Sequence, residues 1–492
     1  MRAPYRPVAP RAERLALAAL TLIAVVSARP AAAQDTREAV RALESHFAAL
    51  TFNPPTPRQA RLSNGVQVFL QEDHTVPTLS VTVVARLGTA NLPDSLWAAG
   101  WQADGLMRTG GTTTLSPDSV DKLIEFYALG IGFSTGQETS NASANGLSRY
   151  RDIMLDLLFD MMRNPRNDTS RIRETVGQVE EGWRRRNDQP GSILGRAWSQ
   201  VMLGDHPFAR SLVTPDEVHA LTPDRVRYVQ NLLYCPDRFI IGVVGDFDQR
   251  AILAKLETLF RGWGRCPAGT RETPPVRYAE GPRTILIEKD VTQSNLRMGH
   301  AGGLRVANTP DYFAAQVADF LLGGGGGFNS RLLQRVRSDS GFAYSVGSNW
   351  GAETRREGQF FAAAQTRANK TVAAVSLMRS VIGSMVTQPV TAEDVQLAKD
   401  NEVNSFVFGF ENPAQIVGRQ IGYVIDGLPP TWFNTYLQGI QAVTPEQVQQ
   451  VAQRYLHADR LITMVVGRPS AFDAPLSTLG PVTTMTLEQI LR

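Results

Sequence analysis

Histidine and cysteine, the residues that most often hold catalytic zinc, are scarce in this chain, with six histidines and two cysteines among 492 residues. No two of the histidines lie four residues apart, the spacing that places two imidazoles on one face of a helix. Cys235 and Cys266 have no histidine near them and so do not form a zinc site. If the chain is exported they can form a disulfide, and two buried free thiols are the alternative.

Long apolar runs are also missing, apart from one near the N-terminus. Four arginines precede an apolar core at residues 15–26, and Ala31 and Ala33 provide a small-residue cleavage signal. This pattern predicts a cleaved secretory signal over residues 1–33, with an uncleaved anchor as the alternative. We therefore expect an exported chain with no membrane span after cleavage.

A large excess of charge of one sign is absent as well. The formal net charge is +3, which gives no basic footprint for nucleic acid. With 43% hydrophobic and 20% charged residues, the composition is typical of a soluble globular protein with a large core. The mature chain, 492 − 33 = 459 residues, is long enough for two large domains or roughly three ordinary ones.

What the sequence does contain is an internal repeat. Three short segments of the first half recur in the second half at one constant offset in residue number: Thr222-Pro223 with Thr444-Pro445, Asp237-Arg238 with Asp459-Arg460, and Gly245 with Gly467. A constant register over three segments indicates two homologous halves. We place the first half at residues 58–263, a Gly- and Pro-rich linker at 264–283, and the second half at 284–470.

Each half mixes Val- and Ile-rich strand patterns with amphipathic helix patterns. This predicts an α+β fold, in which helices pack on a mainly antiparallel sheet in each half. Asn64-Gly65 is a turn signal, and residues 66–70 and 79–86 alternate like two paired strands. Residues 133–143 are rich in small residues and resemble one further strand.

The stretch with the most specific pattern is residues 321–348. An apolar run leads into five glycines, and Asn329-Ser330 can cap a short helix. Gly341 then marks a turn before a strand pattern that begins at Phe342. The segments Ser330-Arg331-Leu332, Val336-Arg337 and 341–346 resemble, at family spacing, the C-terminal half of the pitrilysin and insulinase peptidases.

The resemblance covers residues 58–467 and implies two halves that face each other like a clamshell. It also implies that Arg337 and Tyr344 help to hold a substrate carbonyl near zinc. Two donors on either side of a tight turn can point at one oxygen. Without the resemblance, a surface arginine and a tyrosine with its ring in the core are the alternative. Five glycines would line the substrate path: Gly323, Gly324, Gly325, Gly326 and Gly327.

Active members of that family carry His-x-x-Glu-His on a helix and a second glutamate ligand later in the chain. Aligned on Leu106-Met107, this motif falls on residues 101–105, where Trp101 and Gly105 replace both histidines. Asp104 and Glu181 keep carboxylates at the other two positions. One remaining carboxylate ligand cannot hold a catalytic zinc, so we expect no metal on this chain.

The pattern therefore favours a partner subunit. The resemblance implies a heterodimer in which a homologous chain with His-x-x-Glu-His carries the zinc, while this chain supplies Arg337 and Tyr344 to a peptide substrate. A non-catalytic peptide-binding or scaffold protein that keeps the clamshell is the alternative. An autonomous peptidase with another metal site is disfavoured by the histidine spacing. The signal and the bacterial type of the family favour a periplasmic location.

Overall fold

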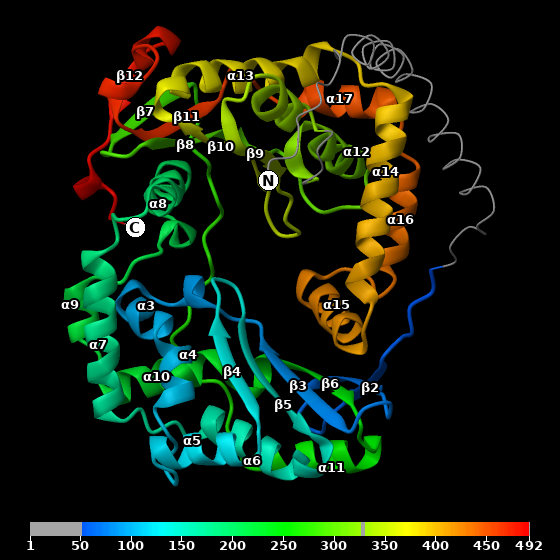
Figure 1. Ribbon diagram of the computed structural model, residues 1–492. Coiled ribbons are helices and arrows are strands. Elements are labelled where there is room, and N and C mark those ends of the chain that lie inside the picture. The colour runs from blue at the N-terminus through cyan, green and yellow to red at the C-terminus, as the bar shows by residue number, and fades with distance from the viewer. Residues whose placement is uncertain (1–51, 326–329, 492) are drawn as a thin grey trace, which may run out of the picture. The chain divides into compact units, whose positions relative to one another are not determined.

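The computed structural model describes residues 52–325 and 330–491. The predicted signal at residues 1–33, and Gly326 and Gly327 of the glycine run, lie outside the described residues. Residues Pro55–Arg492 form one compact unit that contains two six-stranded sheets (Figure 1). Within the described ranges, no helix has the length and apolar character that crossing a membrane requires.

The first sheet has the strand order β1-β2-β6-β3-β5-β4. Its strands are β1 (Arg58–Arg61), β2 (Gln67–Glu72), β3 (Thr78–Ala85), β4 (Gly130–Thr135), β5 (Ser140–Leu147) and β6 (Phe239–Gly245). Only the β2–β6 pair is parallel, so the sheet is mainly antiparallel as predicted. The Asn64-Gly65 signal is also confirmed, because β1 and β2 form a hairpin around Gly65, whose φ is 90°.

The second sheet has the order β12-β7-β11-β8-β10-β9. Strands β7 to β11 repeat the arrangement of β2 to β6, whereas the edge strand β12 comes from later in the chain and pairs parallel to β7. Its strands are β7 (Arg283–Glu288), β8 (Gln293–Ala301), β9 (Ala343–Trp350), β10 (Gln359–Arg367), β11 (Ile462–Gly467) and β12 (Val482–Thr484). β11 lies between β7 and β8, parallel to one and antiparallel to the other, just as β6 lies between β2 and β3. The two homologous halves are confirmed by this shared strand order.

Two details of the strand prediction are wrong. Residues 66–70 and 79–86 form β2 and β3, but these strands do not pair, because β6, from a much later part of the chain, inserts between them. The pattern at residues 133–143 is not one strand: β4 and β5 form a hairpin that turns between Thr135 and Ser140. Alternation within a strand identifies its faces but not its neighbours, so local pattern could not reveal either arrangement.

Helices pack on the sides of the sheets that face away from each other, and other helices lie between the two sheets (Figure 1). Those of the first half are α3 (Asp94–Trp101), α4 (Ala103–Thr109), α5 (Pro117–Phe126), α6 (Arg151–Arg163), α7 (Thr169–Arg184), α8 (Pro190–Leu203), α9 (Pro215–His219), α10 (Pro223–Leu233) and α11 (Gln249–Phe260). Those of the second half are α12 (Pro310–Asp319), α13 (Thr371–Thr387), α14 (Ala392–Val407), α15 (Pro413–Asp426), α16 (Trp432–Gln441) and α17 (Pro445–Tyr455).

The repeat extends to helix caps. α10 and α17 each have 11 residues, with proline at the first turn. The hydroxyls of Thr222 and Thr444 accept hydrogen bonds from the backbone N–H groups of Arg225 and Gln447, so the caps keep the offset of the sequence repeat. The Thr-Pro signal in the sequence is therefore the start of the same helix in each half.

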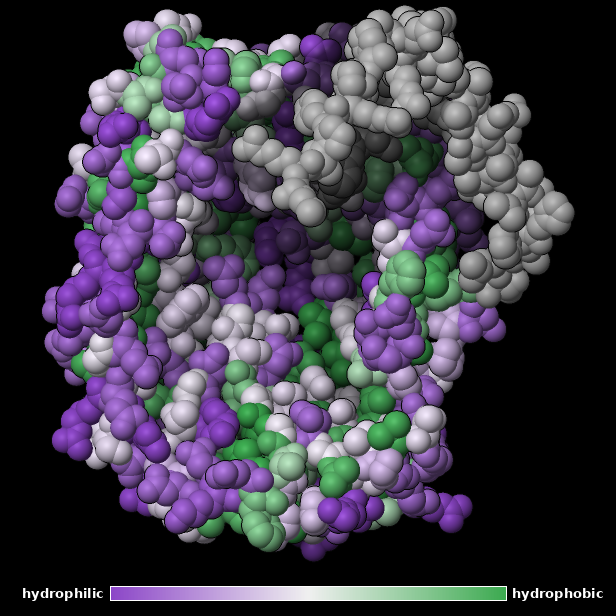
Figure 2. Space-filling view, viewed as in Figure 1, coloured by the Kyte–Doolittle hydropathy of each residue, from purple (hydrophilic) through white to green (hydrophobic). Residues whose placement is uncertain are grey.

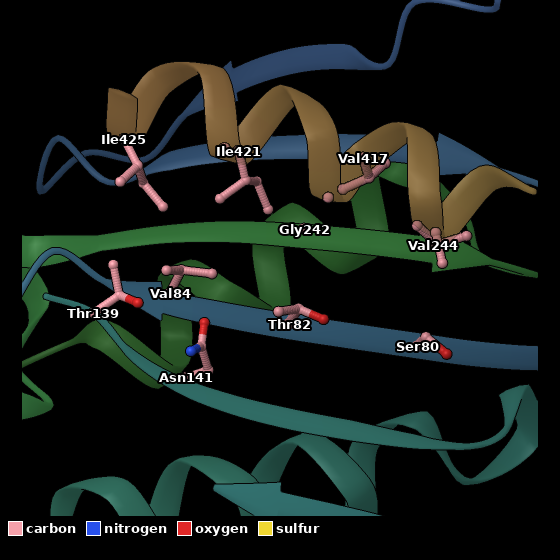
Figure 3. A pocket seen from close by; sticks show the side chains of 13 residues that line it. Ser80, Thr82, Val84, Thr139, Asn141, Gly242, Val244, Val417, Ile421 and Ile425 are labelled. Atoms are coloured by element: carbon pink, nitrogen blue, oxygen red, sulfur yellow. The ribbon is translucent and has the colours of Figure 1, made fainter. Parts of the chain in front are cut away.

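Two helices cross to the sheet of the other half. α8 packs on β8 and β11 of the second sheet, and α15 packs on β2 and β6 of the first. Beside α15 lies an apolar groove of about 290 Å³, lined by Thr82, Val84 and Asn141 on the sheet and by Gly418 and Ile421 on the helix (Figure 3). The face in Figure 2 is hollowed between the two halves. Reciprocal crossing joins the halves into one unit.

The two cysteines form a disulfide. Cys235 follows α10 and Cys266 lies 31 residues later, with the two Cα atoms 5.4 Å apart. The bridge thus joins the end of α10 to the segment that leads into the second half. By loss of chain entropy in the unfolded state, a loop of this length contributes about 3.5 kcal/mol of stability.

Candidate functional site

The glycine run lies against strand β9. After α12 the chain forms one wide helical turn, η5 (Phe320–Gly324), which packs on β9. A Cβ atom on Gly323 would lie 2.7 Å from the backbone nitrogen of Ser348, which is closer than real side chains approach. A Cβ on Gly324 would collide with the Asp319 carboxylate. At Gly323 the close approach of the Ser348 backbone therefore favours glycine.

The predicted order of helix, turn and strand is present. The helix η6 (Leu333–Asp339) precedes Gly341, whose φ of 63° suits glycine, and β9 begins at Ala343. The backbone N–H of Gly341 donates to the carbonyl of Arg337 at 3.0 Å and closes the helix. The turn reverses the chain, so the last turn of η6 lies beside β9.

This turn brings Arg337 and Tyr344 together. The guanidinium carbon of Arg337 lies 5.5 Å from the centre of the Tyr344 ring. Tyr344 is 79% exposed on β9, an edge strand of the second sheet. The alternative of a tyrosine with its ring in the core is therefore wrong. Within the described ranges the Tyr344 hydroxyl makes no hydrogen bond.

Behind the glycine segment lies a polar contact that the sequence analysis missed. The carboxylate of Asp319, at the end of α12, accepts a hydrogen bond from the Ser348 hydroxyl at 2.6 Å. Burial raises the pKa of Asp319 above its usual range, while this hydrogen bond opposes the shift. The contact joins α12 to β9 under the turn that carries Tyr344. An aspartate inside the apolar run from Val317 to Leu322 was the available signal.

The residues at the family's zinc positions lie at the end of α3 and in the first turn of α4, on either side of Gln102. Trp101 stacks on Trp97 with ring centres 5.1 Å apart. The two oxygens of Asp104 accept hydrogen bonds from the backbone N–H groups of Gly105 at 2.7 Å and Thr135 at 3.2 Å. Burial raises the pKa of Asp104. Asp104 thus ties α4 to β4 rather than facing an open site.

Glu181 lies on α7, where hydrophilic side chains gather over α7 and α9 (Figure 2). Its side chain is 44% exposed and pairs with Arg184 at 2.6 Å and Arg185 at 2.5 Å. Neither an indole nor a glycine can bind zinc, so these positions do not fit the metal that the fold family implies. Over residues 52–325 and 330–491, no group of three or more His, Cys, Asp or Glu side chains is placed to hold a metal ion.

Two histidines in loops, His74 and His206, make hydrogen bonds within the protein. Nδ1 of His74 lies 2.7 Å from the carboxylate of Asp246, and this hydrogen bond raises the pKa of His74. Nδ1 of His206 accepts a hydrogen bond from the backbone N–H of Phe208 at 3.1 Å. Nε2 of His206 donates to the backbone carbonyl of Pro274 at 2.9 Å.

Comparison with known proteins agrees with this picture. Residues 220–402 match a family model described as the peptidase M16 inactive domain. A Mycobacterium leprae protein named an uncharacterized zinc protease is 24% identical over 411 residues, which cover 80% of this chain and 88% of that protein. A Helicobacter pylori protein named a non-peptidase homolog is 20% identical over 405 residues, which cover 82% and 91%.

Solved structures share the fold. A peptidase M16 inactive domain from Pseudomonas fluorescens has a TM-score of 0.73 at 20% identity and covers 84% of this chain and 98% of that chain. The periplasmic protease PqqL from Escherichia coli has a TM-score of 0.72 at 13% identity. That match covers 86% of this chain but 48% of PqqL, so one chain of the present length corresponds to about half of the longer protein.

Proposed function

We propose that this chain acts as an inactive partner subunit, because residues 220–402 match the peptidase M16 inactive domain and the sequence resembles the pitrilysin and insulinase family. In this role it supplies Arg337 and Tyr344 in trans to a homologous subunit that carries His-x-x-Glu-His and zinc. The observation that carries the proposal is a contrast between the two halves. The Arg337 guanidinium lies near the ring of the exposed Tyr344, whereas Trp101 and Gly105 occupy the zinc positions.

The chemistry of the pair suits peptide hydrolysis. When water adds to a peptide carbonyl, negative charge develops on the carbonyl oxygen. The Arg337 guanidinium and the Tyr344 hydroxyl would donate hydrogen bonds to that oxygen, and donors of this kind contribute about 3 kcal/mol each to the transition state. The partner's zinc would supply the activated water. The glycine segment would let a substrate backbone approach closely beside the pair.

The remaining parts of the proposal concern place and partner. A disulfide between Cys235 and Cys266 suits an oxidising compartment, which supports export and a periplasmic location. The E. coli structure in the comparison is itself described as periplasmic. The double-length match supports pairing with a second chain of this fold, because two such chains would equal the longer protein. We propose a heterodimer with a zinc-bearing homologue, and a peptide as its substrate.

The test is peptide cleavage by the purified mature chain, alone and mixed with a candidate zinc-bearing homologue, with bound zinc quantified in each. We expect the chain alone to be metal-free and inactive and the mixture to cleave. Arg337→Ala or Tyr344→Phe in this chain should lower kcat of the mixture by about 100-fold. Arg335→Ala is the matched control, because Arg335 lies on the same helix and pairs only at 3.8 Å with Asp339.

Two results would contradict the proposal. Stoichiometric zinc and cleavage with this chain alone would show that the interpretation of residues 101–105 is wrong. Peptide binding without cleavage in any mixture, unaffected by Arg337→Ala, would instead favour the scaffold function, in which a peptide adds to a sheet edge.

A further inference from the structure

Four arginines from both halves surround one cavity of about 550 Å³, which we call the arginine cavity. Arg86 follows β3 of the first sheet, Arg305 follows β8 of the second, and Arg355 and Arg356 lie in the loop between β9 and β10. Two carboxylates, Glu138 and Glu272, also line it. Four positive and two negative side chains leave a formal surplus of 4 − 2 = 2 positive charges.

Two of these arginines are fixed in place by the protein. The guanidinium of Arg356 donates to Glu138 at 2.9 Å and lies 4.2 Å from the centre of the Phe208 ring. Arg355 donates to the backbone carbonyl of Ile425 at 2.7 Å. Side chains that are already held lose little conformational freedom when a ligand binds, so this wall of the cavity is preorganised.

The other two arginines have no such partner. In the described part of the chain, the guanidinium groups of Arg86 and Arg305 take part in no ion pair or side-chain hydrogen bond, and both side chains are exposed. Glu138 is engaged by Arg356, and Glu272 alone does not balance the remaining charge. Like charges around one cavity repel one another, and an anion between them would remove this cost.

We propose that the arginine cavity binds acidic side chains of a peptide and that Arg86 and Arg305 are its principal contacts. The guanidinium fork matches the two oxygens of a carboxylate. A volume of about 550 Å³ accommodates a short peptide segment. Arg86 belongs to the first half and Arg305 to the second, so the ligand would bridge the two. The choice of a peptide as ligand rests on the proposed function, while the anion preference rests on the cavity alone.

The test uses this chain without any partner or zinc. A fluorescent acetylated tetraglutamate peptide is titrated by anisotropy, with the tetraglutamine peptide as the neutral comparison. We expect binding of the glutamate peptide only, weakening as NaCl rises from about 0.05 to about 0.5 M because the charges are screened. Arg86→Ala and Arg305→Ala should each weaken binding about tenfold, and Arg305→Lys less. Arg173→Ala, an exposed arginine of α7 outside the cavity, is the control.

Equal binding of the two peptides, or unchanged affinity in both arginine variants, would overturn the inference. Tighter binding of free citrate than of the glutamate peptide would overturn the peptide as ligand. Arg86 and Arg305 make no internal side-chain bonds in the described chain, so their replacement should leave the melting temperature unchanged, which circular dichroism checks. Neither of these results would change the cleavage test of Arg337 and Tyr344, so the two proposals can fail separately.

Discussion

Helices α8 and α15 begin at Pro190 and Pro413, occupy equivalent places in the two halves, and each crosses to the sheet of the other half. The two helices differ in how many buried residues they contribute to these contacts. α8 contributes five buried residues to a core that includes Ile285, Ile462 and Met464 of the second sheet. α15 contributes only Val417 and Ile421 to a small cluster with three residues of the first sheet.

One pair of equivalent positions in α8 and α15 accounts for this difference in buried contacts. When the two helices are aligned on their first prolines, Trp198 of α8 corresponds to Ile421 of α15. The indole of Trp198 is buried and donates to Gln359 at 3.0 Å, whereas Ile421 borders the apolar groove (Figure 3). A smaller side chain leaves space that the rest of the helix does not fill. The two helices therefore lie at equivalent places in the two halves, but their contacts with the sheet of the other half contribute unequally to stability.

The largest expected effect comes from replacing one buried isoleucine by alanine in each of the two helices. Ile193→Ala in α8 removes a fully buried side chain from the larger core, and we expect a loss of about 4 kcal/mol in the free energy of unfolding. Ile421→Ala should cost about 2 kcal/mol, because the adjoining groove already leaves that cluster loosely filled. Urea unfolding of the two variants measures the difference, and equal losses would show that both contacts are equally tight.

A smaller effect on stability is expected when the glycines at equivalent positions of the two helices are replaced by alanine. Gly195 and Gly418 lie inside α8 and α15, and an added Cβ would meet no atom within 4 Å at either site. Replacement by alanine should stabilise each helix by about 1 kcal/mol through helix propensity. Gly418→Ala should gain slightly more, because its methyl group enters the apolar groove. A melting temperature that falls in either variant would contradict the packing described here.

The smallest expected effect concerns one charge pair of the first half, His74 with Asp246. The Asp246 carboxylate raises the pKa of exposed His74, and the pKa of Asp246 is lowered by the same hydrogen bond. Because the folded pKa of His74 exceeds its unfolded value, the pair stabilises the fold below the ordinary histidine pKa, and the contribution is lost as pH rises through the raised pKa. Asp246→Asn should return the His74 pKa toward its ordinary value, as followed by NMR titration.

The control for this titration is Ser148→Ala, which removes the other hydrogen bond to Asp246, at 2.8 Å, and leaves the histidine contact in place. It should change the His74 pKa less than Asp246→Asn does. A larger change with Ser148→Ala would mean that the position of Asp246, and not its charge, sets the pKa.

Much of the fold was predictable because its signals are local. The Thr-Pro caps of α10 and α17, the hairpin at Gly65 and the short helix before Gly341 each depend on a few adjacent residues. The positions of Arg337 and Tyr344 on either side of one tight turn followed in the same way. The contact between Asp319 and Ser348 did not, because its partners come from different elements.

By itself, then, the sequence determined that there are two homologous halves, that the histidines of the zinc motif are missing, and that Arg337 and Tyr344 flank a turn. Residue identity and short spacing are enough for such conclusions. The tertiary structure alone decided that β6 lies between β2 and β3, that α8 and α15 exchange sheets, and that Arg86 and Arg305 meet at one cavity. These contacts join residues that are far apart in the sequence. Hydrophobic burial, which drives the packing of strands and helices, is non-directional, so a local sequence pattern does not show which elements will meet.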